Sequence, residues 1–165
     1  MWFRRHEFPF AVIGGLALHA YGISRVTFDL DLITVRESQG GVIDLLEGLG
    51  YETLHKSVGF SNHQHSDPEW GRLDLLYVDG ATGTKLFGET ECRELFEGVQ
   101  IEVPRPEHLI ALKLHAMHND PDRSIQELGD IRFLLNLPGV DQEEVGELFE
   151  KRGRRELYER LREAT

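Results

Sequence analysis

The stretch of residues 11–34, AVIGGLALHAYGISRVTFDLDLIT, decides how the rest of the chain is interpreted. Its order predicts an apolar strand, a Gly-Gly turn, a short helix, and then a strand that carries Asp29 and Asp31. Because side chains alternate along a strand, the two carboxylates point to the same face. Neighbouring carboxylates repel each other, so the pair needs a cation, a shared proton or a basic partner. This electrostatic requirement is the first indication of function.

The composition predicts a folded protein of one domain, or one domain with a small appendage. The chain has 165 residues, of which 40% are hydrophobic, and this is enough for a sizeable core. The net charge of −11 argues against general binding to nucleic acid or anionic membranes, although it leaves a local basic groove possible. The basic cluster at residues 151–155 is interpreted mainly as a solvated helix end.

The cysteine count and the hydropathy predict a soluble cytoplasmic protein with no membrane partner. Cys92 is the one cysteine, which rules out an internal disulfide framework and fits a reducing compartment. No stretch approaches the roughly 18–20 apolar residues of a membrane span. The N-terminal sequence lacks the long apolar region of a signal peptide.

Periodicity and turn residues predict an α+β fold, with a sheet-rich part at residues 1–103 and a helical part at residues 104–165. Strands are expected at residues 10–13, 26–34, 51–56, 59–65, 72–78, 91–96 and 99–103, the last two as a hairpin. Helices are expected at residues 16–21, 37–49, from 106, at 124–137, and after an N-cap at Asp141, with a short terminal helix; residues 82–88 are expected to form a loop. The expected apolar stripe of the helix at 124–137 is Ile125, Leu128, Ile131, Leu134 and Leu135. We expect the helical part to be a cap on the same core.

Three features of the first part carry chemical information. Gly14 and Gly15, between a strand and a helix, let the backbone approach a ligand closely, although such a pair often marks only a tight turn. Same-face carboxylates could hold divalent cations for phosphoryl chemistry, although alone they fit solvated strand acids as well. Asp74 lies in the apolar strand RLDLLYV, where an acid is costly to bury unless it is coordinated or paired with an arginine such as Arg72 or Arg25.

The combination is more specific than its parts. A Gly-Gly turn, an acid-x-acid strand and a third acid on a later strand resemble the nucleotidyltransferase (polymerase-beta-like) superfamily. The segment GGLALHAYGISRVTFDLDL is most similar to the small prokaryotic branch that includes AbiEii-type toxins, and the resemblance covers roughly residues 10–135.

The resemblance implies a mixed sheet flanked by helices, with a helical C-terminal part. It implies that Gly14 and Gly15 contact a nucleoside triphosphate through their backbone, and that Asp29 and Asp31 bind Mg²⁺ or Mn²⁺. Asp74 would complete the metal site and activate an acceptor hydroxyl. The implied reaction transfers a nucleoside monophosphate from the triphosphate to that hydroxyl and releases pyrophosphate.

Three further residues are candidates for nucleotide binding. Thr27 shares the face of Asp29 and Asp31 by alternation, so it is expected to line the site. Arg25 could bind phosphate or form a salt bridge at the start of the strand. Lys113 could reach a triphosphate or extend its ammonium from a core-facing helix to solvent.

Other candidates are interpreted as structural. The histidine pairs His63 and His65, and His115 and His118, lack the usual spacing of a zinc site and are expected to be surface or capping residues. Trp70 is expected to pack a loop rather than stack on a base.

Two other functions stay open at this point. One is a non-catalytic module of the same fold, such as a component of a toxin–antitoxin or regulatory system that binds protein or RNA. The other is a metal-dependent enzyme that hydrolyses rather than transfers. The acceptor could be a protein, a tRNA or a small hydroxylated molecule such as an antibiotic, and a second copy or a partner protein could complete its site.

Overall fold

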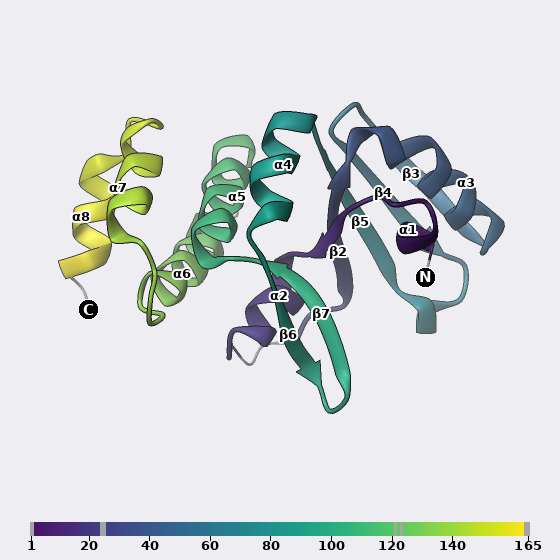
Figure 1. The fold of residues 1–165 in the computed structure, drawn as a ribbon, viewed down its shortest axis with the longest axis horizontal. Coiled ribbons are helices and arrows are strands. Elements are labelled where there is room, and N and C mark those ends of the chain that lie inside the picture. Colours follow the sequence, from purple (N-terminus) through teal and green to yellow (C-terminus); the bar gives the residue numbers. More distant parts are fainter. Residues whose placement is uncertain (1, 24–25, 121, 123, 164–165) are drawn as a thin grey trace. The chain divides into compact units, whose positions relative to one another are not determined.

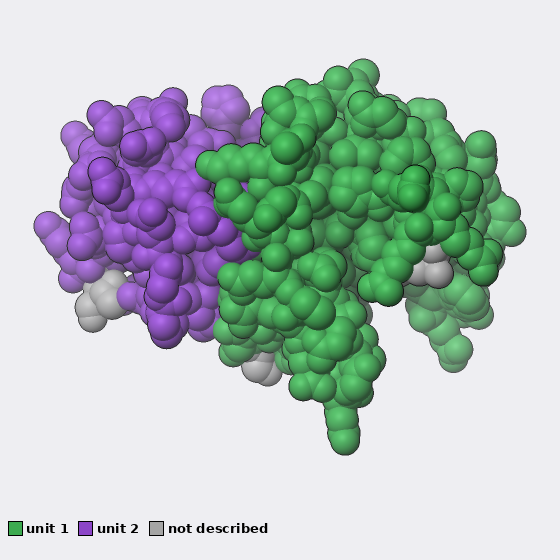
Figure 2. Space-filling model, in the orientation of Figure 1, with its two compact units in different colours: residues 1–104 green, residues 105–165 purple. Residues whose placement is uncertain are grey.

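The fold is described from a computed structural model of the chain, in which residues 2–23, 26–120, 122 and 124–163 are described. The chain divides into two compact units, residues 1–104 and residues 105–165, which Figure 2 colours separately. Both sheets belong to the first unit, and the described part of the second unit is helical. Whether the second unit caps the core of the first stays a prediction.

The first unit contains a five-stranded mixed sheet, a two-stranded hairpin and four α-helices (Figure 1). The sheet has the order β1-β2-β5-β4-β3; β2 and β5 are parallel and the other neighbours are antiparallel. The strands are β1 (Phe10–Val12), β2 (Asp29–Val35), β3 (Tyr51–Lys56), β4 (Phe60–His65), β5 (Arg72–Val78) and, in the hairpin, β6 (Thr90–Phe96) and β7 (Val99–Pro104). The helices are α1 (Trp2–Arg5), α2 (Gly14–Ala20), α3 (Gln39–Gly48) and α4 (Gly80–Gly88). This architecture confirms the predicted α+β class.

The two faces of the central strands differ in burial because side chains alternate along each strand. One face of β2, β4 and β5 is buried, and it carries Leu32, Thr34, Ser61, His63, Leu73, Leu75 and Tyr77. The opposite face is only half-buried near the start of β2 and β5, and it carries Asp29, Asp31, Asn62, Gln64, Arg72 and Asp74. We call this second set the acid face. The polar side predicted for the acidic strand therefore lies on the less covered face of the sheet.

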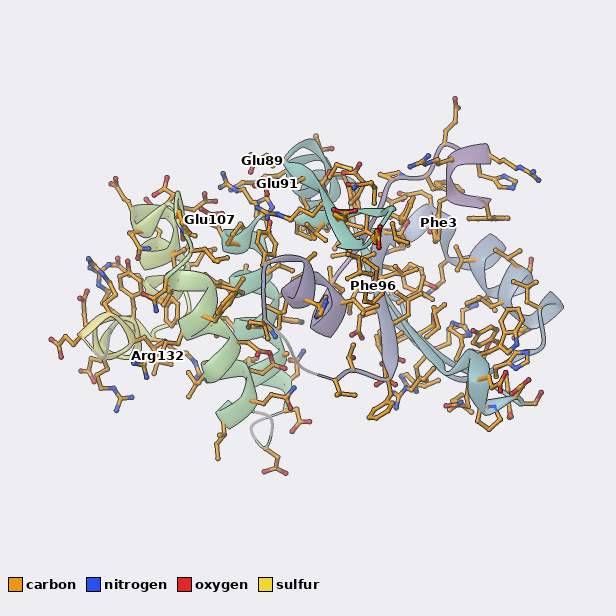
Figure 3. All side chains as sticks on the ribbon, turned by 90° about the horizontal axis from the view of Figure 1, so that it is seen from below. Phe3, Glu89, Glu91, Phe96, Glu107 and Arg132 are labelled. Atoms are coloured by element: carbon orange, nitrogen blue, oxygen red, sulfur yellow. The ribbon has the colours of Figure 1, made fainter. Side chains whose placement is uncertain are left out.

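Helix α2 is fixed to the hairpin by Tyr21, which directly follows it. The Tyr21 hydroxyl donates to the Pro104 carbonyl oxygen at 2.9 Å, and the Arg93 guanidinium lies 4.0 Å from the centre of the Tyr21 ring. The carboxylate of Glu91, labelled in Figure 3, also accepts from this hydroxyl, and burial raises the pKa of Tyr21. These contacts hold the C-terminal end of α2 against the hairpin.

Two local predictions in the first unit were wrong, and one helix was not predicted. Residues 80–88 form helix α4 rather than a loop, because the Asp79 side chain caps it by accepting from the Thr82 amide at 3.1 Å. Strand β2 begins at Asp29 and not at residue 26. The N-terminal helix α1 was not expected. Its Phe3, labelled in Figure 3, is buried, and its ring is stacked on that of Phe10 with centres 4.8 Å apart.

The second unit consists of α5 (Pro106–Asn119), α6 (Ser124–Leu135), α7 (Gln142–Glu150) and α8 (Arg155–Glu163). Asp141 caps α7 as predicted, by accepting from the amides of residues 143 and 144 at 3.0 Å. Ile125 was wrongly placed in the apolar stripe of α6, since its side chain is 89% exposed. The buried side of α6 is formed by residues with helical spacing, namely Glu127, Asp130, Ile131, Leu134 and Leu135. Among the helices described, none is both long and apolar enough to span a membrane.

Candidate active site

The parallel pairing of β2 with β5 brings the three predicted acids together. In this register Asp31 lies opposite Asp74, and Asp29 lies opposite Arg72. The antiparallel pairing of β4 with β5 places Asn62 on the other side of Asp74. Neighbouring strands are about 4.8 Å apart, so Asp31, Asp74 and Asn62 form a row of adjacent oxygen-bearing side chains across three strands.

The glycine turn packs directly against this row. Gly14 has a φ of +63°, and a Cβ atom added to it would lie 1.9 Å from Oδ2 of Asp31. A Cβ on Gly15 would lie 2.8 Å from that of Thr27, so this position also excludes a side chain without rearrangement. The Ile13 amide donates to the Asp31 carbonyl oxygen at 2.9 Å, which ties the turn to β2. The two glycines are required because α2 begins in contact with the acidic strand.

Thr27 lies beside the first acid, as its position in the chain suggested. Its hydroxyl donates to the Asp29 carbonyl oxygen at 3.4 Å. Arg25, the other candidate in this segment, lies outside the described residues.

Asp74 is paired with an arginine from its own strand. The Nε atom of Arg72 donates to Oδ1 of Asp74 at 3.0 Å, with the side chains 39% and 18% exposed respectively. This is one of the two salt bridges considered from the sequence. The pair compensates the charge of an acid that is mostly buried in an otherwise apolar strand.

Asn62 was missed in the sequence analysis. Its Oδ1 atom is buried and has no hydrogen-bond partner among the described residues. Native proteins leave few buried polar atoms unpaired, so an orphan oxygen beside an acid row points to a missing donor or cation. The available signal was an asparagine in the middle of a predicted strand, a position where this residue is disfavoured.

The acid face fits a hard divalent cation in its donor chemistry. Carboxylate and carboxamide oxygens are the ligands that Mg²⁺ and Mn²⁺ accept, and the three acids come from two adjacent strands. Within the described ranges, no three His, Cys, Asp or Glu side chains are already arranged to hold an ion. Asp74 instead accepts the hydrogen bond from Arg72.

The reverse face of the same strands holds a chain of hydrogen-bonded side chains. The Ser61 hydroxyl lies 2.8 Å from Nε2 of His63 and 2.8 Å from the Tyr77 hydroxyl. The Thr53 hydroxyl lies 3.1 Å from Nδ1 of His63 and donates to Glu47 at 2.8 Å. Burial lowers the pKa of His63 and raises that of Tyr77. His63 is therefore a core residue, contrary to the expectation of a surface or capping histidine.

Two other predicted residues have well-defined surroundings. The Lys113 ammonium donates to Glu127 at 2.8 Å and to Asp130 at 2.6 Å, all within the second unit. Its side chain is 10% exposed, so it does not extend to solvent as the alternative interpretation required. Trp70 stacks on His65 with ring centres 5.2 Å apart, and its carbonyl oxygen accepts from the Tyr51 hydroxyl, so it packs its loop as predicted.

Comparison with known proteins identifies the fold through structure alone. No family model and no curated protein sequence matches the chain. It is similar to the solution structure of the antibiotic-resistance factor ANT(2'')-Ia, with a TM-score of 0.66 and 19% identity over 99% of this chain and 92% of that one. A crystal structure of ANT(2'')-Ia with adenylyl-2''-tobramycin gives a TM-score of 0.66 and 17% identity, over 95% of this chain and 90% of the other.

The lincosamide antibiotic adenylyltransferase LnuA, in its lincomycin-bound crystal structure, is also similar. Its TM-score is 0.55 at 17% identity, over 82% of this chain and 90% of that one. The protein therefore has the fold of antibiotic nucleotidyltransferases. Membership of the AbiEii-type branch stays a prediction.

Proposed function

We propose that this protein is a nucleotidyltransferase that moves a nucleoside monophosphate from a triphosphate to a hydroxyl group of a small molecule. The observation that carries the proposal is the register that sets Asp31 opposite Asp74, with Asp29 on the same face. The close approach of Gly14 to the Asp31 carboxylate supports it, because it brings the backbone of the glycine turn directly beside the acids. The fold shared with antibiotic nucleotidyltransferases also supports it.

The three acids share one role in this proposal, and Asp74 has a second. Asp29, Asp31 and Asp74 would hold Mg²⁺ or Mn²⁺, which when bound orients the triphosphate and neutralises charge that develops at the α-phosphate. Asp74 would accept the proton of the acceptor hydroxyl. The acceptor oxygen then bonds to the α-phosphorus as the bond to the bridging oxygen of the β-phosphate breaks, and pyrophosphate leaves.

The remaining candidates would bind the nucleotide. Gly14 and Gly15 would contact the phosphates through their backbone, and Thr27 would line the site beside Asp29. Arg25 and Lys113 are proposed as phosphate-binding residues on the resemblance alone. For Lys113 the triphosphate would have to compete with Glu127 and Asp130 for the ammonium.

The acceptor proposed here is a small hydroxyl-bearing molecule of the antibiotic class. The similar structures contain lincomycin and an adenylylated tobramycin, both small-molecule ligands. The net charge of −11 favours a neutral or cationic acceptor over a tRNA, whose phosphates the protein would repel. We propose that the protein modifies such a compound in the cytoplasm.

The test is pyrophosphate release by the purified chain with Mg²⁺, each of the four ribonucleoside triphosphates, and tobramycin or lincomycin as acceptor. We expect acceptor-dependent release of pyrophosphate, with the nucleotidyl adduct detected by mass spectrometry. Asp74→Asn should abolish it, whereas Asp44→Asn, at an exposed position on α3, should not.

Other outcomes separate the competing functions. Release of orthophosphate without an adduct would indicate a hydrolase. Failure of the wild type to bind any metal–nucleotide complex would favour a non-catalytic module that binds protein or RNA.

A further inference from the structure

Arg72 is a cation built into the acid face. It lies opposite Asp29 on the neighbouring strand and two residues before Asp74, so its side chain shares the face of all three acids. Its Nε atom donates to Asp74 at 3.0 Å. Its other guanidinium N–H groups make no hydrogen bond to any of the described residues, and the side chain is 39% exposed.

The free N–H groups match a phosphate better than a second structural partner. A guanidinium presents five N–H donors in a planar fork that can grip a phosphate with two parallel hydrogen bonds. One of these donors, the Nε–H group of Arg72, forms the hydrogen bond to Asp74.

We infer that Arg72 binds the triphosphate, and that before the metal–nucleotide complex arrives it neutralises the acid face by pairing with Asp74. This inference rests on the proposed function and adds a phosphate-binding residue to that site. Arg72 is then a temporary partner for Asp74. When a metal cation binds the Asp74 carboxylate, the Arg72 guanidinium is repelled by the cation and attracted by the phosphates.

The inference predicts opposite effects on two ligands. Without Arg72, Asp74 loses a competing cation, so a divalent metal alone should bind more tightly. The metal–nucleotide complex should bind less tightly, because the phosphates lose a bidentate donor. A residue that only positioned Asp74 would shift both affinities in the same direction.

The experiment uses the full chain and two probes, Mn²⁺ alone and Mn²⁺ with the α,β-methylene analogue of ATP. Electron paramagnetic resonance of free Mn²⁺ gives the first Kd, and calorimetry gives the second. For Arg72→Gln we expect the Mn²⁺ Kd to fall a few-fold and the analogue Kd to rise about tenfold or more. Arg72→Lys, which keeps the charge without the fork, should recover part of the analogue affinity.

Arg155→Gln is the matched control. Arg155 also pairs through Nε with a carboxylate, that of Glu159 at 2.8 Å, lies 4.0 Å from the Glu150 carboxylate, and is 53% exposed on α8. It should change neither Kd. Circular dichroism of all variants checks that the fold is kept.

Three results would overturn the inference. If the wild type binds Mn²⁺ but no Mn²⁺–analogue complex, the proposed function fails together with it. If the wild type binds the complex and Arg72→Gln weakens it no more than Arg155→Gln does, only the role of Arg72 fails. Equal weakening of both probes in Arg72→Gln would reduce Arg72 to a residue that positions Asp74.

Discussion

The two faces of strands β2, β4 and β5 differ in how their polar side chains are hydrogen-bonded. On the buried face, Ser61, His63 and Tyr77 are linked by hydrogen bonds of 2.8 Å. On the acid face, the Asp74 carboxylate accepts from Arg72 beside two further acids, and Oδ1 of Asn62 is buried without a partner in the described structure. The residues of the two sets alternate along the same strands. The two sets therefore differ in hydrogen bonding although they lie in the same part of the sheet.

This difference predicts that the buried face serves stability and that the acid face serves ligand binding. A buried polar group that is fully hydrogen-bonded holds one arrangement of the core, whereas an unsatisfied or repulsive group costs free energy. Proteins retain groups with such a free-energy cost mainly at sites where a bound ligand satisfies them. The comparison predicts that substitutions of the three acids lower activity and spare stability, and that substitutions on the buried face do the reverse.

The largest expected effect is on activity, from Asp29→Asn or Asp74→Asn. Each change removes a proposed metal ligand, and we expect transfer to fall by about 10³-fold or more. The free energy of unfolding should be unchanged or slightly higher, because repulsion on the acid face decreases. Pyrophosphate release and urea unfolding measure the two quantities. Retention of full activity in the double variant would refute the three-acid site.

The largest expected effect on stability comes from Ser61→Ala. The change leaves Nε2 of His63 and the hydroxyl of Tyr77 without their shared partner, at a cost of about 2–3 kcal/mol in the free energy of unfolding. Ser57→Ala is the control, because Ser57 is exposed. Urea unfolding monitored by circular dichroism gives the values. A loss no greater than that of the control would show that the buried chain is not a stabilising feature.

The pH dependence of stability should report on His63. Burial lowers the pKa of this histidine in the folded protein, while the charges of Glu47 and Asp74 oppose the shift. As pH falls through about 6.5, the unfolded chain takes up a proton that the folded chain refuses until lower pH. Stability from this group is therefore complete above about pH 6.5 and decreases below it, down to the lowered folded pKa.

Urea unfolding at about pH 7.5 and about pH 5.5 measures this loss. The loss between the two pH values should be smaller in His63→Gln, and unchanged in His118→Gln at an exposed position on α5. An identical pH dependence in His63→Gln and the wild type would contradict the assignment to His63.

The smallest expected effect is that of Asn62→Leu. The variant removes an unpaired buried oxygen, so the free energy of unfolding should change by less than about 0.5 kcal/mol or increase. Gln64→Leu, on the same strand and face, should cost about 0.5–1.5 kcal/mol, because the Gln64 amide donates to the Gly71 carbonyl oxygen at 3.3 Å. A loss of stability in Asn62→Leu larger than that in Gln64→Leu would show that the Asn62 oxygen is not an unsatisfied group.

The sequence by itself determined the local features of this protein. Alternation placed Asp29 and Asp31 on one face, and apolar runs predicted six of the strands to within a residue or two. Asp141 was recognised as a helix cap from its side chain and position. Such features depend on side-chain type and nearest neighbours, so they can be derived without knowing the fold. Helix α4 escaped prediction because its glycine- and threonine-rich sequence has low helix propensity.

Only the tertiary structure decided which distant residues meet. The register of β2 against β5 chose Asp31 as the neighbour of Asp74, and Arg72 as the neighbour of Asp29. It also placed Asn62 beside Asp74, and it buried His63 on the reverse face. A shift of one residue would have turned every side chain of a strand to the other face. Register is set by the burial of one whole face and by turns far along the chain, and no local pattern contains that information.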